Sequence, residues 1–128
     1  MTDLQPFERL AGLCARFDTS ARLDEWDWSA IFEYGEGSVP TPDEIAEITD
    51  LWVISPEGYA SLDVALICRL RDGRWASCVA WADTSGFGCQ QGVDWRINST
   101  REAAISQGLD KESRTHLGLA LPGEENNR

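Results

Sequence analysis

Basic side chains are scarce in this sequence, and histidine is almost absent. Its 128 residues contain 11 Lys and Arg against 22 Asp and Glu, with one His, for a net charge of -11. Binding to nucleic acid by neutralising phosphates needs clustered Lys and Arg, and anionic membranes attract basic surfaces for the same reason. We therefore expect no direct contact with nucleic acid and none with a membrane.

Long apolar runs are absent as well. The amino terminus lacks the basic stretch and apolar run of a secretory signal, and nowhere does the chain approach the roughly 18 apolar residues of a membrane span. These absences predict a soluble, cytoplasmic protein, located in the host cytoplasm if a phage encodes it. In that compartment we expect the four cysteines to be free thiols.

Spacings typical of metal sites are missing. The sequence has no Cys-x-x-Cys pair, and His116 is its only histidine. Closed tetrahedral sites are built mainly from Cys and His, so these residues could complete one only through an unusual assembly. No metal and no cofactor is expected.

The chain length suits one domain, since compact domains cluster at roughly 100–150 residues. We expect this domain to span residues 1–122, with a polar tail at 123–128. The predicted fold class is α+β, with an antiparallel sheet of three to five strands around a central hairpin at 61–81. Helices from the amino-terminal and carboxyl-terminal parts are expected to pack against that sheet.

The central hairpin is the clearest structural signal. Apolar residues alternate along its first strand, and Asp72-Gly73 follows at the two central positions of a type I′ turn. A two-residue loop pairs Leu70 with Trp75. In that register Cys68 and Cys78 point to opposite faces, which excludes a disulfide between them.

Further elements are predicted around the hairpin. Helices are expected at 3–17, 101–107 and 110–117 from their apolar spacing and capping residues. Short strands are expected at 51–55 and 95–98.

Acidic residues are concentrated near the amino terminus. Residues 1–50 contain 12 acids and 3 bases, whereas the remainder of the chain is close to neutral. At 24–37 acids and aromatic residues interleave without a clean period, which is typical of an interaction surface. The alternative is that the aromatic residues fill the core while the acids face water.

A further helix is predicted at 42–50, because Thr41 and Glu44 match a capping box with Pro42 at the first helical position. On a helical wheel the acids of this segment share one face, opposite its apolar residues. We expect either a partner-binding face or an ordinary solvated one. The acids of this face are Asp43, Glu44, Glu47 and Asp50.

The segment 83–94 is the most chemically suggestive loop. Its glycines allow backbone N–H groups to approach a ligand. Cys89 could act as a nucleophile with His116 as base and Asp83 or Asp94 as the orienting group. An ordered loop with a semi-buried thiol is the plain alternative. The residues of this alternative ligand loop are Asp83, Thr84, Ser85, Gly86, Gly88, Cys89 and Gln90.

Three stretches of the carboxyl-terminal half carry a resemblance. They are the run Leu70-Arg71-Asp72-Gly73-Arg74-Trp75-Ala76, the segment from Ala80 to Asp94, and the helix that begins Arg101-Glu102-Ala103. Over about residues 70–119 the chain resembles a group of small proteins of actinobacteria and their phages that have no known function. The resemblance implies a bacterial or phage setting and no catalytic residue.

The acid excess, without catalytic or metal signatures, favours a non-enzymatic binding protein. We expect it to contact a basic surface of another protein, such as a host nucleic-acid-binding protein, and to imitate nucleic acid there. If a phage encodes the protein, we expect it to inhibit a CRISPR-like defence complex of the host. The alternatives are an immunity-type protein that neutralises a toxin, and a small-molecule or nucleotide binder that uses the 83–94 loop. The predicted contact residues are Asp24, Glu25, Trp26, Asp27, Trp28, Glu33, Glu36, Asp43, Glu44, Glu47 and Asp50.

Overall fold

The computed structural model describes residues 6–14, 17, 25–33, 35–54, 61–83 and 90–123. Its elements in chain order are α1 (Pro6–Leu13), α2 (Glu25–Glu33), β1 (Glu36–Gly37), the 3₁₀ helix η1 (Pro42–Glu44), β2 (Ile45–Ile54), β3 (Ser61–Leu70), β4 (Trp75–Asp83), β5 (Gln90–Asn98), α3 (Arg101–Ser106) and α4 (Lys111–Leu117). The strands form one five-stranded sheet in the order β1-β5-β4-β3-β2. All neighbours are antiparallel except β1 and β5. The predicted α+β class with a mostly antiparallel sheet is confirmed.

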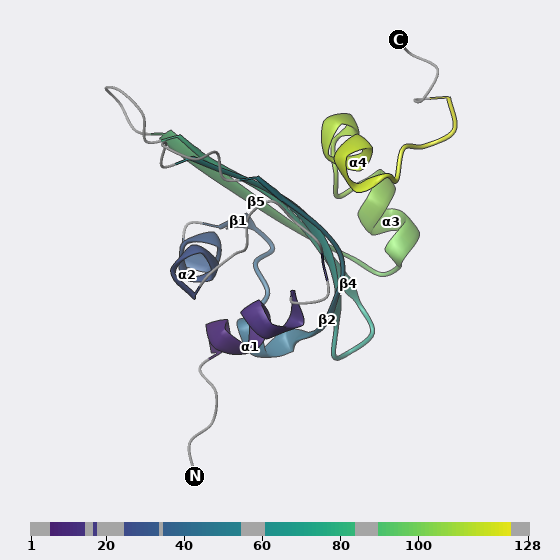
Figure 1. The fold of residues 1–128 in the computed structure, drawn as a ribbon. Helices are drawn as coiled ribbons and strands as arrows, with labels where there is room; N and C mark the ends of the chain where they lie inside the picture. Colours follow the sequence, from purple (N-terminus) through teal and green to yellow (C-terminus); the bar gives the residue numbers. More distant parts are fainter. Residues whose placement is uncertain are drawn as a thin grey trace.

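Helices cover both faces of this sheet. Figure 1 shows α1 and α2 on one side and α3 and α4 on the other. The α1/α2 face carries the larger apolar cluster, which includes Leu66, Cys68, Cys78 and Trp95. The α3/α4 face carries a smaller one around Ile67. Helices from both ends of the chain therefore pack on the sheet, as predicted.

The predicted helix at 42–50 is wrong. Only one 3₁₀ turn follows Thr41, and the chain then continues as β2. Two register shifts, between Ile45 and Glu47 and between Ile48 and Asp50, each insert one extra residue opposite β3. Each bulge resets the alternation of side chains. Apolar residues three positions apart therefore face the same core although the backbone is extended, and this spacing imitates a helix.

The hairpin lies where it was predicted, but its register is shifted by one residue. Arg69, and not Leu70, lies opposite Trp75. The N–H of Gly73 donates to the carbonyl of Leu70 at 3.0 Å, and the N–H of Leu70 donates to that of Arg74 at 2.8 Å. Gly73 has a φ of +93°, and no described non-glycine residue has a positive φ. The predicted type I′ turn needs a positive φ at two residues, whereas a type I turn followed by a left-handed glycine needs it at one. The single positive φ at Gly73 fits the second kind of turn.

This shift changes where the cysteines point. Cys68 pairs with Ala76 and Cys78 with Leu66, and both thiols are buried in the cluster that faces α1 and α2. They share a face, so the prediction of opposite faces is wrong. Both are free thiols, as is Cys14.

The two carboxyl-terminal helices match their predictions closely. Thr100 and Asp110 cap α3 and α4 by accepting from the N–H groups of Ala103 and Ser113. Gly118 closes α4 in the left-handed conformation. The strand predicted at 51–55 is described to Ile54 as the final part of β2, and the strand predicted at 95–98 is the final part of β5. The helix predicted at 3–17 is described from Pro6 to Leu13, and its predicted end is too late, because Cys14 lies in a turn and Phe17 in a bend.

Gly108 sets the distance between α3 and the sheet. A Cβ at this position would collide with Oγ of Ser77 on β4 and would lie 2.6 Å from the carbonyl oxygen of Ala104. Only a residue without a side chain lets the end of α3 approach the strand this closely.

Replacing Gly108 by Ala is therefore expected to lower the free energy of unfolding by about 1–3 kcal/mol, because the added methyl group overpacks the contact with Ser77. Urea denaturation followed by circular dichroism measures the change. Gly12→Ala is the matched control, since nothing lies within 4 Å of a Cβ there and α1 should gain up to about 1 kcal/mol. Equal effects of the two substitutions would contradict this account of Gly108.

Candidate functional site

The acids predicted to line one helix face are distributed differently in the structure. Glu44 accepts from Arg74 at 3.4 Å, Glu47 lies 3.6 Å from Arg69, and Asp50 accepts from Arg101 at 2.7 Å. Because each of these carboxylates pairs with an arginine of the same chain, the segment does not form a bare acidic stripe.

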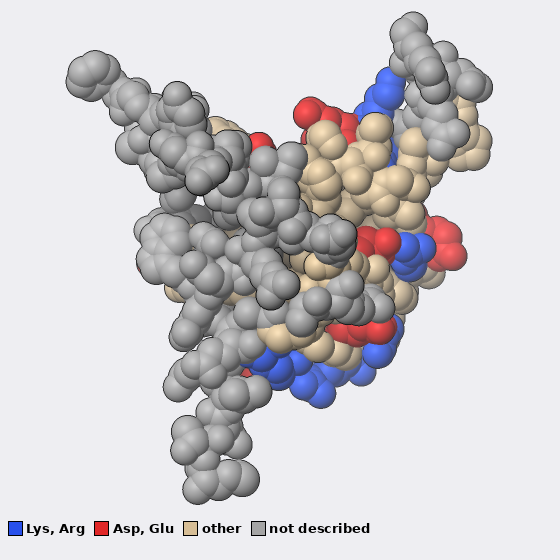
Figure 2. All heavy atoms as spheres, viewed as in Figure 1, with Lys and Arg blue, Asp and Glu red and all other residues tan. Residues whose placement is uncertain are grey.

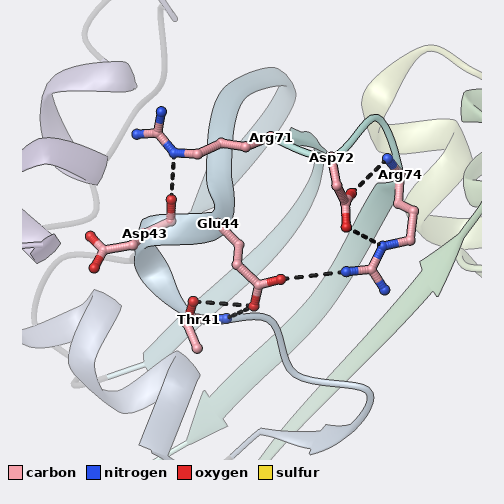
Figure 3. Close-up of polar contacts among 6 residues, drawn as sticks. All are labelled: Thr41, Asp43, Glu44, Arg71, Asp72 and Arg74. Atoms are coloured by element: carbon pink, nitrogen blue, oxygen red, sulfur yellow. Dashed lines mark hydrogen bonds and ion pairs between the residues drawn. The ribbon is translucent and has the colours of Figure 1, made fainter.

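The turn between β3 and β4 supplies part of this neutralisation. Arg71 donates to the carbonyl oxygen of Asp43 at 2.6 Å, while Arg74 contacts both Asp72 and Glu44 (Figure 3). The backbone N–H of Arg74 lowers the pKa of the Asp72 carboxyl below its usual value. In Figure 2 blue atoms gather along the lower edge, where Figure 1 places this turn, with red atoms beside them. These arginines hold the turn against η1.

The acidic–aromatic segment at 24–37 is divided between core and surface. Trp28 is fully buried and stacks on Phe32, which in turn stacks on Trp95. This burial supports the alternative in which the aromatic residues fill the core. Glu33 and Glu36 are exposed. Asp24 and the side chains of Glu25, Trp26 and Asp27 lie outside the described residues.

The glycine-rich loop is the connection between β4 and β5. Asp83 and Gln90 pair at its two ends. Thr84, Ser85, Gly86, Gly88 and Cys89 lie outside the described residues, so their role as a ligand loop stays a prediction. His116, the proposed base, stacks on Trp52 with ring centroids 3.9 Å apart and lies 3.5 Å from Glu112.

The thiols that the structure does describe are not activated. Burial raises the pKa of Cys14 and of Cys68 to about 12, and it raises that of Cys78 as well. A nucleophilic thiol requires a lowered pKa and access to solvent. These three cysteines are therefore core residues.

A groove that sequence reasoning missed lies on the α3/α4 face. Two adjoining hollows of about 530 and 290 Å³ share Val79, Trp81 and Asp110. One runs toward β5 and β1, and the other runs toward α4. We call the two hollows together the Trp81 groove.

Trp81 is the exposed feature of this groove. It is 43% exposed, which among the described large apolar side chains is unusual. A Cβ at Gly92 on the neighbouring strand would lie 2.6 Å from its Nε1 and 2.9 Å from its Cε2. The indole therefore lies over Gly92, and a larger residue there would displace it.

Carboxylates surround the indole. Asp63 lies directly opposite Trp81 on β3, and Asp94 follows Gly92 by two residues on the same face of β5. Glu36 lies opposite Asp94 across the β1–β5 pair. Among the described residues, the acids that line the groove are Glu36, Asp63, Asp94, Asp110 and Glu112, and the one guanidinium belongs to Arg96.

Among the predicted contact residues whose side chains the structure describes, only Glu36 lines this groove. Two sequence signals could have pointed to it. Trp81 is one of the alternating residues of β4, shortly before the glycine-rich segment. Gly92 lies within β5, the strand that follows this segment. A glycine inside a strand often marks a close approach by another group.

No family model, curated protein or solved structure matches the chain. Among the described residues no group of three or more His, Cys, Asp or Glu side chains could hold a metal ion. None of the described helices is long and apolar enough to cross a membrane.

The raised thiol pKa values predict a loss of stability in alkali. Folded Cys68 keeps its proton up to about pH 12, whereas the unfolded chain releases it near 9.0. The stability that the protonated Cys68 thiol contributes is therefore fully present below pH 9.0, its pKa in the unfolded chain. It falls as pH rises toward the pKa of about 12 in the folded protein. Between about pH 8 and pH 10 we expect a loss of roughly 1 kcal/mol from this thiol in urea denaturation. Over the same pH range the Cys68→Ala variant should lose roughly 1 kcal/mol less unfolding free energy than the wild type. An unchanged pH dependence in the variant would contradict the prediction.

The ion pairs of β2 predict that Asp50 contributes more to stability than Glu47. The Asp50 side chain is 16% exposed and that of Glu47 is 47% exposed. Thr49 also donates to Asp50 at 2.7 Å. Asp50→Asn should cost about 1 kcal/mol of unfolding free energy, and Glu47→Gln less than about 0.5 kcal/mol. A double-mutant cycle of Asp50 with Arg101 measures the coupling energy of this ion pair. A coupling energy near zero would contradict the predicted contribution of Asp50.

Proposed function

We propose that this protein is a non-enzymatic binding protein that takes a basic surface of another protein into the Trp81 groove. The observation that carries the proposal is the chemistry of the groove. Among the described residues, five with carboxylates and one with a guanidinium line the two hollows beside a half-exposed tryptophan. An aromatic anchor with a charged surround is typical of protein contact surfaces.

The pairing of charges elsewhere supports this location. Glu44, Glu47 and Asp50 already contact arginines of the same chain, so a partner would have to displace those contacts. In the groove, Arg96 pairs with Asp94 at 3.2 Å, and no described cation pairs with Glu36 or Asp63. Their charges therefore remain available to attract a basic partner.

The net charge of -11 supports a narrower form of the proposal. Proteins that bind nucleic acid carry basic surfaces, and an acidic protein of this kind is attracted to them in place of the nucleic acid. We propose a host nucleic-acid-binding or defence protein as the partner and the cytoplasm as the place of contact.

The test uses two charge-matched triple variants. In the first, Glu36→Gln, Asp63→Asn and Asp94→Asn neutralise the groove. In the second, Glu33→Gln, Asp43→Asn and Glu47→Gln neutralise the same charge on the predicted amino-terminal contact surface. Partners captured from bacterial lysate are identified by mass spectrometry and purified, and their affinity is measured by calorimetry at low and high salt.

We expect the groove variant to weaken binding by at least roughly 10-fold and the amino-terminal variant by less than roughly 3-fold. Affinity should fall as salt increases, because charges drive the encounter. The reverse order of the two variants would place the contact on the amino-terminal surface. Equal affinity at both salt concentrations would reject a charge-driven contact altogether.

A further inference from the structure

We infer that Trp81 receives the guanidinium group of an arginine in an extended basic segment of the partner. This inference rests on the proposed function and names the chemistry that the groove recognises. It depends on three features of the groove: the support beneath the indole, the carboxylates beside it and the space on its two sides.

Gly92 provides the support. The ring atoms Nε1 and Cε2 of Trp81 approach the position of a Cβ at Gly92 within 2.6 and 2.9 Å. The indole is held against the backbone of β5 while 43% of the residue stays exposed. An aromatic ring held in this way is already ordered, so stacking a ligand on it costs little further conformational entropy.

The carboxylates beside the ring select a cation. Asp63 is the direct cross-strand neighbour of Trp81, with Cβ atoms expected about 4.5–5.5 Å apart, and Asp94 is a diagonal neighbour at about 7–8 Å. A guanidinium over the indole can therefore reach a carboxylate at its edge. Planar guanidinium groups combine stacking on tryptophan with paired hydrogen bonds to carboxylates, which an ammonium group does not do.

A second pair of neighbouring carboxylates in the groove points the same way. Glu36 and Asp94 are direct neighbours across the β1–β5 pair, and both line the larger hollow. Arg96 pairs with Asp94 at 3.2 Å, whereas no described cation pairs with Glu36. A bound cation would therefore meet a further carboxylate here, whereas a phosphate-bearing nucleotide would meet like charge.

The two hollows give the segment a path. They lie on either side of Trp81 and share it, together with Val79 and Asp110. An extended segment can therefore cross the strands with one arginine over the indole and its neighbours in the hollows. Further basic residues of that segment would meet Glu112 in the smaller hollow or Glu36 in the larger one.

The test compares two labelled peptides of equal length and charge, one with arginines and one with lysines at the same positions. Their affinities for the full chain are measured by fluorescence anisotropy. The wild-type protein is expected to prefer the arginine peptide by about 3- to 10-fold, since stacking adds to the charge attraction. Trp81→Leu keeps an apolar side chain without the ring and should abolish the preference.

Gly92→Ala tests the support beneath the ring. It retains every groove side chain but displaces the indole, and it should also reduce the arginine preference. Gly12→Ala is the glycine control and should leave the preference unchanged. Unfolding midpoints in urea confirm that each variant is folded before its affinity is compared.

The outcomes separate the two proposals. If Trp81→Leu retains the arginine preference, or if the wild type binds both peptides equally, the guanidinium site is rejected. If in that case the groove triple variant still weakens both peptides, the proposed function survives the loss of this inference. If the triple variant affects neither peptide, the proposed function itself is rejected.

Discussion

The central strands must bury apolar side chains on both of their faces, and the rest of the structure follows from this constraint. The run Val64–Cys68 is buried without interruption, so consecutive side chains need cover on opposite sides of the sheet. On the α3/α4 face the available helices have only 6 and 7 residues, about 9–10 Å of axis, whereas the 9 residues of β4 span about 30 Å. Among the described residues, those helices leave part of that face uncovered, and Trp81 lies in this part.

Charge is divided between structure and surface. Each arginine whose side chain the structure describes contacts a carboxylate or a backbone carbonyl of the same chain. These contacts tie the hairpin turn to η1 and α3 to β2. Since basic side chains are few, pairing them at these joints leaves carboxylates in excess around the groove. Some of the acids therefore stabilise the fold by pairing with arginines, and the others remain as negative charge on the surface.

Prediction from sequence succeeded where a local rule decides the conformation. Thr100 and Asp110 cap their helices because their side-chain oxygens satisfy N–H groups within the next turn. Prediction failed for β2, because its two bulges give apolar residues the spacing of a helix. The bulges are formed against β3, a partner distant in the sequence. The Trp81 groove was missed for a similar reason, since Asp63, Trp81 and Gly92 come from three strands.

The sequence by itself determined the hairpin position, the capped helices, the α+β class and the excess of acid, because each depends on residues close together in the chain or on composition alone. The tertiary structure decided which acids are neutralised and which remain around an exposed ring. It also decided the hairpin register, in which the N–H of Arg71 donates to the carbonyl of Glu44 and only Gly73 of the turn has a positive φ. These outcomes depend on cross-strand pairing and on how much of each face a short helix can cover, and neither is encoded within a single segment.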